Sequence, residues 1–272
     1  GYANDVGGIV TVHDEQLGEK NLSWERIEEI EFLPVPAGSD PGVTRLHGVV
    51  ETDAGQFTGF IQWDKEECLS TDKLDAEDDE GKVSIPLGRV RAIERRGFSG
   101  SLVTLKDGES LRLRGTNDVD EDNRGVMVED PRYGRVTIPW KEFDKVTFSD
   151  PAGSGPGYRD YPAGRQLSGT VRDAKGREHR GRIVFDLDES EDWEMLNGTY
   201  EGVECDIPFG MVRALEPQRA DRTLATLRDG TELLLEDSQD VTASNDGVLI
   251  YTGGKKPVYV AWEDVEEIRF EP

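Results

Sequence analysis

The stretch SIPLGRVRAIE at residues 84–94 decides the fold, because it returns as DIPFGMVRALE at residues 206–216. The sequence around it repeats in the same order: VTLKDGESLRL (103–113) matches ATLRDGTELLL (225–235). A shift of about 122 residues that holds over many segments is the mark of an internal duplication. We therefore expect two long repeats in this 272-residue chain.

Each long repeat consists of two related halves. A half opens with two short segments of alternating apolar and polar residues around a turn such as Asp107-Gly108, a dipeptide that favours a tight β-hairpin. It closes with a strand and one short helical turn, as at Ile85-Pro86 and Ile138-Pro139, and we expect the proline at the start of that strand or on a sheet edge, where its missing N–H is tolerated. An isolated hairpin is marginal in water, so further strands must complete each half. The sequence therefore predicts an all-β fold, a tandem array of small five-stranded barrels.

The repeat also predicts where the barrels begin and end. Residues 1–35 match only the last three strands of a half, so we expect a partial barrel there. Its unpaired edges are unfavourable; we expect either that the chain starts further upstream or that another segment donates the missing strands. Full barrels are expected at 43–96, 97–149, 164–217 and 218–272, with a Pro/Gly-rich linker at 150–163.

Two short motifs resemble those of the Sm-like family of SH3-like barrels. The segment DAGQFTGFIQWD (53–64), with Gly59 and Asp64, resembles the first Sm motif, and the strand pair from Ile85 to Ile93 resembles the second. The resemblance implies an SH3-like barrel for each half. Sm-like proteins bind RNA through an Asn and basic residues in loops, whereas the matching loop here, 65–68, reads Lys-Glu-Glu-Cys. This acidic loop departs from the family and argues against RNA binding.

The charge of the chain excludes several partners. There are 57 acidic and 32 basic residues, for a formal net charge of −25. Nucleic acids and anionic lipids both need a cationic face, so neither is an expected partner. No apolar run is long enough to span a membrane. Such acidity is typical of exported proteins and of salt-adapted microbes; we expect an extracellular or periplasmic location, with the cytoplasm of a salt-adapted microbe as the alternative.

Catalytic groups do not recur with the repeat. The three histidines, His13, His47 and His179, hold no common repeat position, and no serine or cysteine lies in a nucleophile elbow. We expect no enzyme. Cys68 and Cys205 have neither metal-site nor disulfide-framework spacing, which leaves two inert thiols or one long-range disulfide.

The tryptophans suggest a core and a contact surface. Trp24, Trp140 and Trp262 share one repeat position, which predicts core packing. Trp193 has no counterpart and lies with Tyr200 in the acidic loop 188–202, where a ring could stack on a sugar or anchor a protein. The linker tyrosines Tyr158 and Tyr161 are further candidates of this kind.

One acidic segment resembles a calcium loop. In NDVDEDNRGVMVE (117–129), Asp118, Asp120, Asp122 and Glu129 occupy positions 1, 3, 5 and 12 of the template, and Ca²⁺ takes six to eight oxygen ligands. Position six is Asn123 rather than glycine. Calcium is the one cofactor for which the sequence offers candidate ligands, and no other cofactor is expected.

Duplication without a repeated catalytic group favours a surface that binds other proteins. We expect a non-enzymatic structural or protein-interaction module, with protein partners that include copies of itself. Strand complementation at the partial barrel is the expected route to self-assembly. A carbohydrate-binding or calcium-binding module is the alternative.

Overall fold

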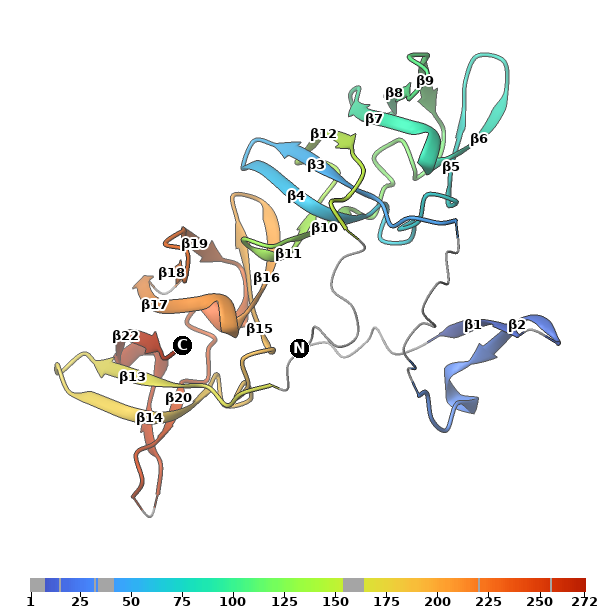
Figure 1. Ribbon diagram of the computed structural model, residues 1–272. Coiled ribbons are helices and arrows are strands. Elements are labelled where there is room, and N and C mark those ends of the chain that lie inside the picture. Colours follow the sequence, from blue (N-terminus) through green and yellow to red (C-terminus); the bar gives the residue numbers. More distant parts are fainter. Residues whose placement is uncertain are drawn as a thin grey trace. The chain divides into compact units, whose positions relative to one another are not determined.

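The computed structural model describes residues 8–14, 16–31, 33, 42–153, 164–219, 221–254 and 256–272. The chain divides into two compact units, Gly1–Pro41 (unit 1) and Gly42–Pro272 (unit 2). Unit 1 holds a two-stranded sheet and unit 2 a 20-stranded sheet. Figure 1 shows the strands of each unit. The all-β prediction is confirmed. Within these residues, no helix has the length and apolar character needed to cross a membrane.

Unit 2 contains two modules with the same order of strands. The first module (42–153) contains β3 (His47–Thr52), β4 (Gly55–Gln62), β5 (Lys73–Glu77), β6 (Lys82–Pro86), β7 (Val90–Arg95), β8 (Gly100–Leu105), β9 (Ser110–Arg114), β10 (Val126–Asp130), β11 (Gly134–Ile138) and β12 (Phe143–Phe148). The second module (164–272) contains β13 (Ser168–Asp173), β14 (Glu178–Phe185), β15 (Met195–Tyr200), β16 (Val203–Pro208), β17 (Val212–Arg219), β18 (Arg222–Leu227), β19 (Glu232–Glu236), β20 (Val248–Tyr251), β21 (Val258–Val260) and β22 (Val265–Phe270). Short 3₁₀ turns precede β7, β17 and β22 at Leu87–Arg89, Phe209–Met211 and Trp262–Asp264, where the sequence predicts helical turns.

The two halves of a module exchange strands. Hairpin β3–β4 pairs through β4 with β10 and through β3 with β12, so these strands and β11 form an outer set in the order β11-β10-β4-β3-β12. The intervening strands form an inner set in the order β6-β5-β9-β8-β7, and β7 joins it to β12. The second module repeats each of these pairings. The expected boundary at 96/97 therefore falls inside the inner set, between the paired strands β7 and β8.

Paired glycines let the strands of the outer set approach closely. Gly48 and Gly59 face each other across hairpin β3–β4. A Cβ at Gly59 would lie 1.9 Å from the carbonyl oxygen of Glu129 on β10, and one at Gly48 would lie 2.3 Å from that of Thr147 on β12. Any larger residue would therefore push β10 or β12 out of register with the hairpin.

The modules are joined strand to strand, and each has an aromatic core. β11 of the first module pairs antiparallel with β16 of the second, with Val136 opposite Cys205. In the first module Trp140 stacks on Phe143, and both rings lie near the fully buried Trp63.

Unit 1 is a lone hairpin that corresponds to the last strands of a module. β1 (Ile9–Asp14) pairs with β2 (Gly18–Ser23), and a 3₁₀ turn follows at Trp24–Arg26. The alignment without gaps places Asp14, Gly18 and Trp24 on Asp130, Gly134 and Trp140. Residues 27–31, the expected fifth strand, contain no strand. Their counterpart β12 is held by β3 and β7, and no strand in the described part of unit 1 takes those places.

Candidate functional site

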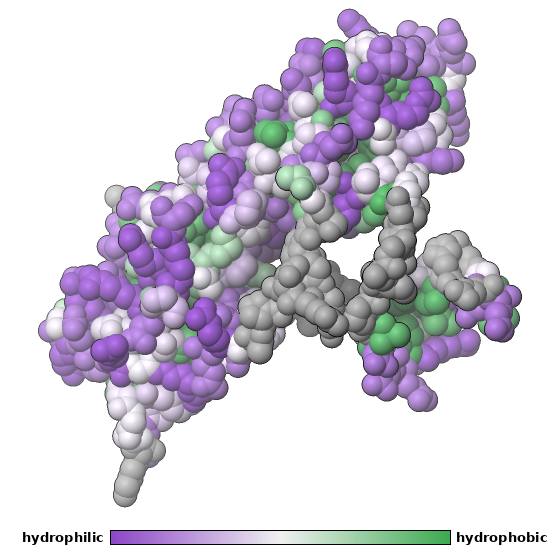
Figure 2. All heavy atoms as spheres, in the orientation of Figure 1, coloured by the Kyte–Doolittle hydropathy of each residue, from purple (hydrophilic) through white to green (hydrophobic). Residues whose placement is uncertain are grey.

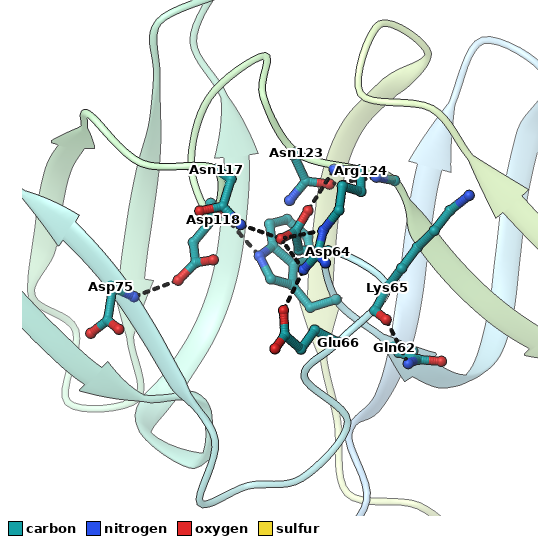
Figure 3. A network of polar contacts seen from close by, with 11 residues as sticks. Gln62, Asp64, Lys65, Glu66, Asp75, Asn117, Asp118, Asn123 and Arg124 are labelled. Atoms are coloured by element: carbon teal, nitrogen blue, oxygen red, sulfur yellow. Dashed lines mark hydrogen bonds and ion pairs between the residues drawn. The ribbon is translucent and has the colours of Figure 1, made fainter. Parts of the chain in front are cut away.

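A cluster of carboxylates lies at the same place in each module. In the first, oxygens of Asp64, Glu67 and Asp118 all lie within 4.8 Å of one another (cluster 1). In the second, Asp186, Asp188 and Glu189 do the same (cluster 2). The turn after the long strand β4 or β14 brings these side chains towards the loop that follows β9 or β19 (Figure 3 shows Asp64 and Asp118 of cluster 1).

A tight, strained turn builds each cluster. The amide of Trp63 donates to the carbonyl of Glu67, and the amide of Glu67 donates back to Trp63. Between them, Asp64 and Lys65 have φ of 49° and 57°, a left-handed conformation that costs energy in residues other than glycine. The turn directs the Asp64 carboxylate into the interior, where its side chain has no exposed surface. Asp186 in the second module repeats this conformation.

An arginine pairs with one carboxylate of cluster 1. The Arg124 guanidinium lies 2.7 Å from Asp64 Oδ2, and it also contacts Glu66 (Figure 3). The backbone amide of Arg124 and the side-chain amide of Asn117 donate to the same Asp64 carboxylate. A buried carboxylate needs such partners, because its desolvation is otherwise unfavourable by several kcal/mol.

Cluster 2 has no counterpart of this arginine, because the chain carries Asp246 at that position. Burial, followed by the neighbouring Asp188, raises the pKa of Glu189 to about 9. Burial also raises the pKa of Asp240 to about 6, and its backbone bond to Asn197 opposes that rise. In cluster 1, burial raises the pKa of Glu67 to about 7. The carboxyl groups of the second module thus lack the guanidinium that pairs with Asp64 in the first, and burial favours their protonated form.

Two atoms in these clusters stand out. Oε2 of Glu67 and Oε2 of Glu189 are both buried, and neither has a hydrogen-bond partner among the described residues. The two glutamates hold equivalent repeat positions. The repeat therefore preserves a carboxyl oxygen that the surrounding side chains leave open to a proton or another ligand.

The structure disperses the four residues predicted to bind calcium. Asp118 belongs to cluster 1, where its Oδ2 accepts from the Asp75 amide. Asp120 Oδ1 accepts from the Asp122 amide in the adjoining loop. Glu129 lies on β10 in an ion pair with Arg45, at 3.1 Å. The sequence motif thus identified one member of the cluster and missed Asp64 and Glu67.

A signal for the missed residues exists in the sequence. An aspartate follows the last core aromatic of the long strand in both repeats, at Trp63-Asp64 and Phe185-Asp186, and a glutamate follows three residues later. Polar residues at matching repeat positions that the strand pattern does not need are candidates for such a cluster.

The predicted aromatic contacts lie apart in the fold. Trp193 is 61% exposed, and its indole packs beside Gly164. Tyr200 ends β15 and packs, partly buried, against the core. Tyr158 and Tyr161 lie outside the described residues.

The histidines and cysteines have local roles. His47 Nδ1 lies 3.0 Å from Ser149 Oγ, and among the described residues no carboxylate bonds to the same ring. His179 Nε2 lies 3.3 Å from Asp173 Oδ2. The side chain of His13 is outside the described residues. Cys68 and Cys205 are both free thiols, and burial raises the pKa of Cys205 to about 12, which leaves it in its unreactive form.

The apolar side chains of unit 1 form the second candidate site. Four of them are about 40% exposed, whereas the residues at the same repeat positions of the first module are buried. The exposed side chains are Val12 (40%), Leu22 (42%), Trp24 (40%) and Ile30 (42%). Their counterparts are Val128 (0%), Ile138 (0%), Trp140 (5%) and Val146 (0%). We call Val12, Leu22, Trp24 and Ile30 the open face. Hydrophobic residues are prominent on the visible surface of unit 1 in Figure 2. The prediction that Trp24 is a core residue is wrong for unit 1, because no strand in the described part of that unit covers its ring.

Comparisons with known proteins returned no relative. No family model, no curated protein and no solved structure matches this chain. Function must therefore be argued from the two candidate sites.

Proposed function

We propose that this protein is a non-enzymatic structural or protein-interaction module, built from small SH3-like, Sm-like barrels, and that unit 1 is its contact element. The observation that carries the proposal is the open face: side chains buried in the first module are about 40% exposed at the same repeat positions of unit 1. An exposed apolar face on a strand pair favours association with a further strand. The acidity of the chain supports an extracellular or periplasmic location for such a module.

The first module indicates what kind of partner the open face fits. There, β10 takes its edge partner from β4, with Val128 opposite Ile61, and β12 takes its partner from β3. The equivalent edges of unit 1 would therefore accept a hairpin of the β3–β4 type, with a glycine where the strands cross, as at Gly59. The chain already uses strand pairing to join its two modules, through β11 and β16.

A second copy of the chain is the partner that we propose. Main-chain hydrogen bonds along the added strands would provide affinity, and alternating side chains would provide register. Within each copy the hairpins β3–β4 and β13–β14 are already paired, so exchange between copies requires one of them to open. Association should therefore be slow and should speed up under mildly destabilising conditions.

Sedimentation over a concentration series tests this proposal. The native chain should associate, and Val12→Asp on the open face should give a monomer. Thr11→Asp, on the same strand but the opposite face, is the matched control and should associate like the native chain. A synthetic peptide covering 45–63 should compete. Monomers at every concentration, together with no binding of that peptide, would contradict the proposal.

Calcium binding is the second candidate function, and the unpartnered Glu67 Oε2 in cluster 1 is the observation that favours it. Millimolar CaCl₂ should then raise the melting temperature of the native chain and of Asp122→Asn. It should leave Asp118→Asn, which changes a cluster residue, unaffected. An equal effect of calcium on all three proteins would assign it to general screening of charge.

Carbohydrate binding has weaker support, from the exposed Trp193 alone. A glycan array on the native chain and on Trp193→Ala tests it. Signals that both proteins share would rule out this residue as the sugar contact.

A further inference from the structure

A pocket opens in the second module where the first module carries an arginine. It has a volume of about 540 Å³, within the range of ligand sites. Its walls include Pro217 at the end of β17, Asp246 in the loop before β20, Tyr259 on β21, and Trp262, Glu263 and Val265 from the last turn and strand. The repeat aligns Pro217 with Arg95.

The first module shows what occupies this position when a side chain is present. Arg95 Nε donates to the carbonyl of Phe143, and its terminal nitrogen lies 3.3 Å from Asp144. Phe143 aligns with Val265, which lines the pocket. The first module thus places its own guanidinium against this turn, whereas Pro217 has no group that can donate there.

The charges around the pocket are reversed between the modules. Three basic residues of the first module, Arg95, Arg124 and Lys141, correspond to Pro217, Asp246 and Glu263 in the second. Asp246 and Glu263 are exposed, and neither carboxylate has an ion pair among the described residues. The wall of the pocket is therefore anionic where the first module is cationic.

An aromatic ring completes the site. Tyr259 is 54% exposed, and its hydroxyl donates to the backbone carbonyl of Asp246 at 3.0 Å, which holds the ring against the loop that carries Asp246. Elsewhere in the same module the Arg182 guanidinium lies 4.1 Å above the Tyr251 ring. A guanidinium in the pocket would gain both a carboxylate and an aromatic face.

We propose that this pocket binds a guanidinium group, the arginine side chain of a partner polypeptide, in the place that Arg95 occupies in the first module. The site belongs to the second module alone, so it does not depend on strand complementation by unit 1. A planar cation with several donors fits a wall that offers a tyrosine ring and two carboxylates better than a compact ammonium does.

The test uses the full chain and the tripeptide Gly-Arg-Gly with blocked ends, followed by calorimetry and by the indole N–H signals in NMR spectra. A lone side chain should bind with a Kd of ~1 mM. The peptide with citrulline, which keeps the shape but not the charge, should bind at least about tenfold more weakly. The peptide with lysine should also bind more weakly than the arginine peptide.

Variants that restore the residues of the first module give the sharpest contrast. Pro217→Arg should abolish binding, because the protein would then fill its own pocket, and Asp246→Arg should abolish it by reversing the charge. Arg95→Ala, which alters the first module only, is the matched control and should bind like the native chain. Melting curves confirm folding of each variant. Absent binding to the native chain, equal binding of the citrulline peptide, or unchanged binding to folded Pro217→Arg would each overturn the proposal.

Discussion

Two asparagines at one repeat position should contribute differently to stability. In the second module Asn245 Nδ2 donates to the carbonyl of Asp240 at 2.9 Å. In the first module the corresponding carbonyl, that of Asp118, accepts instead from Trp63 Nε1 at 3.0 Å. The amide nitrogen of Asn123 is then buried without a partner among the residues that the structure describes. Asn245→Ala should therefore destabilise unit 2 more than Asn123→Ala.

The magnitude follows from what each variant leaves behind. Both asparagines also accept from a glycine amide two residues later, so that loss is common to both variants. Asn245→Ala leaves a buried carbonyl unpartnered, which costs about 1–3 kcal/mol, whereas Asn123→Ala removes a donor that was already unpartnered. For a unit of this size, a difference of ~1 kcal/mol shifts the melting temperature by about 2–4 °C.

A double-mutant cycle on Trp63 and Asn123 extends the comparison. Phenylalanine stands at the position of Trp63 in the second module, as Phe185. In Trp63→Phe, the free amide of Asn123 should donate to the Asp118 carbonyl, as Asn245 does to its counterpart. Adding Asn123→Ala removes both donors, so the double variant should be less stable than the sum of the single variants by about 1–2 kcal/mol.

Urea denaturation followed by circular dichroism gives these free energies, provided that the slopes of the transitions agree between variants. The reasoning is refuted if Asn123→Ala costs as much as Asn245→Ala, or if the cycle is additive. Either result would mean that these carbonyls do not depend on the donors that the structure assigns to them.

Three further predictions concern other features. Burial raises the pKa of Glu67 from its ordinary 4.5 to about 7, so the folded state keeps a proton that the unfolded state loses. The stability that this proton provides should be complete below about pH 4.5 and lost as the pH rises through about 7. Melting temperatures measured across this pH range should fall less for Glu67→Gln than for the native chain, and the decline that remains belongs to the other raised carboxyls, Glu189 and Asp240. Gly59→Ala should destabilise unit 2 by about 1–3 kcal/mol or more through its clash with β10, while Gly153→Ala, which meets no atom within 4 Å, should be neutral in the same urea titration. Trp262→Ala should cost about 3–5 kcal/mol, whereas Trp24→Ala should leave the main unfolding transition unchanged; equal effects would contradict the exposure of the Trp24 ring.

The sequence predicts the local elements well, because turn chemistry and alternation are local. Gly108 has φ of 98° in the turn between β8 and β9, as Asp107-Gly108 predicts. The helical turn after the IP segment is found, as the 3₁₀ turn Leu87–Arg89, but the proline, expected at the start of a strand or on an edge, ends its strand at Pro86. Repetition of these signals was enough to identify the fold as all-β and its two modules as copies.

The pairing of strands and the neighbours of individual side chains could not be predicted from the sequence. The alternation that makes β10 a suitable partner for β4 is also present in β5, so a linear repeat cannot tell which of them the hairpin chooses. The pairing of β4 with β10 brings Asp64 and Asp118 together in cluster 1. The calcium-loop motif contains Asp118 but not Asp64. Trp24 is likewise exposed because no further strand in the described part of unit 1 packs on it, and its local sequence does not reveal this.

Nesting of the inner set within the outer set has a consequence for how the chain folds. The inner set is continuous in sequence from Lys73 to Arg114, so most of its strands meet across short loops, and the pairing of β5 with β9 closes it. Hairpin β3–β4, by contrast, must wait for β10, and closing so long a loop slows folding. During synthesis on a ribosome, the inner set can assemble as soon as Arg114 has emerged, and its collapse draws the two ends of the outer set together. Each module therefore carries, inserted in its own middle, the segment that guides its outer strands to one another.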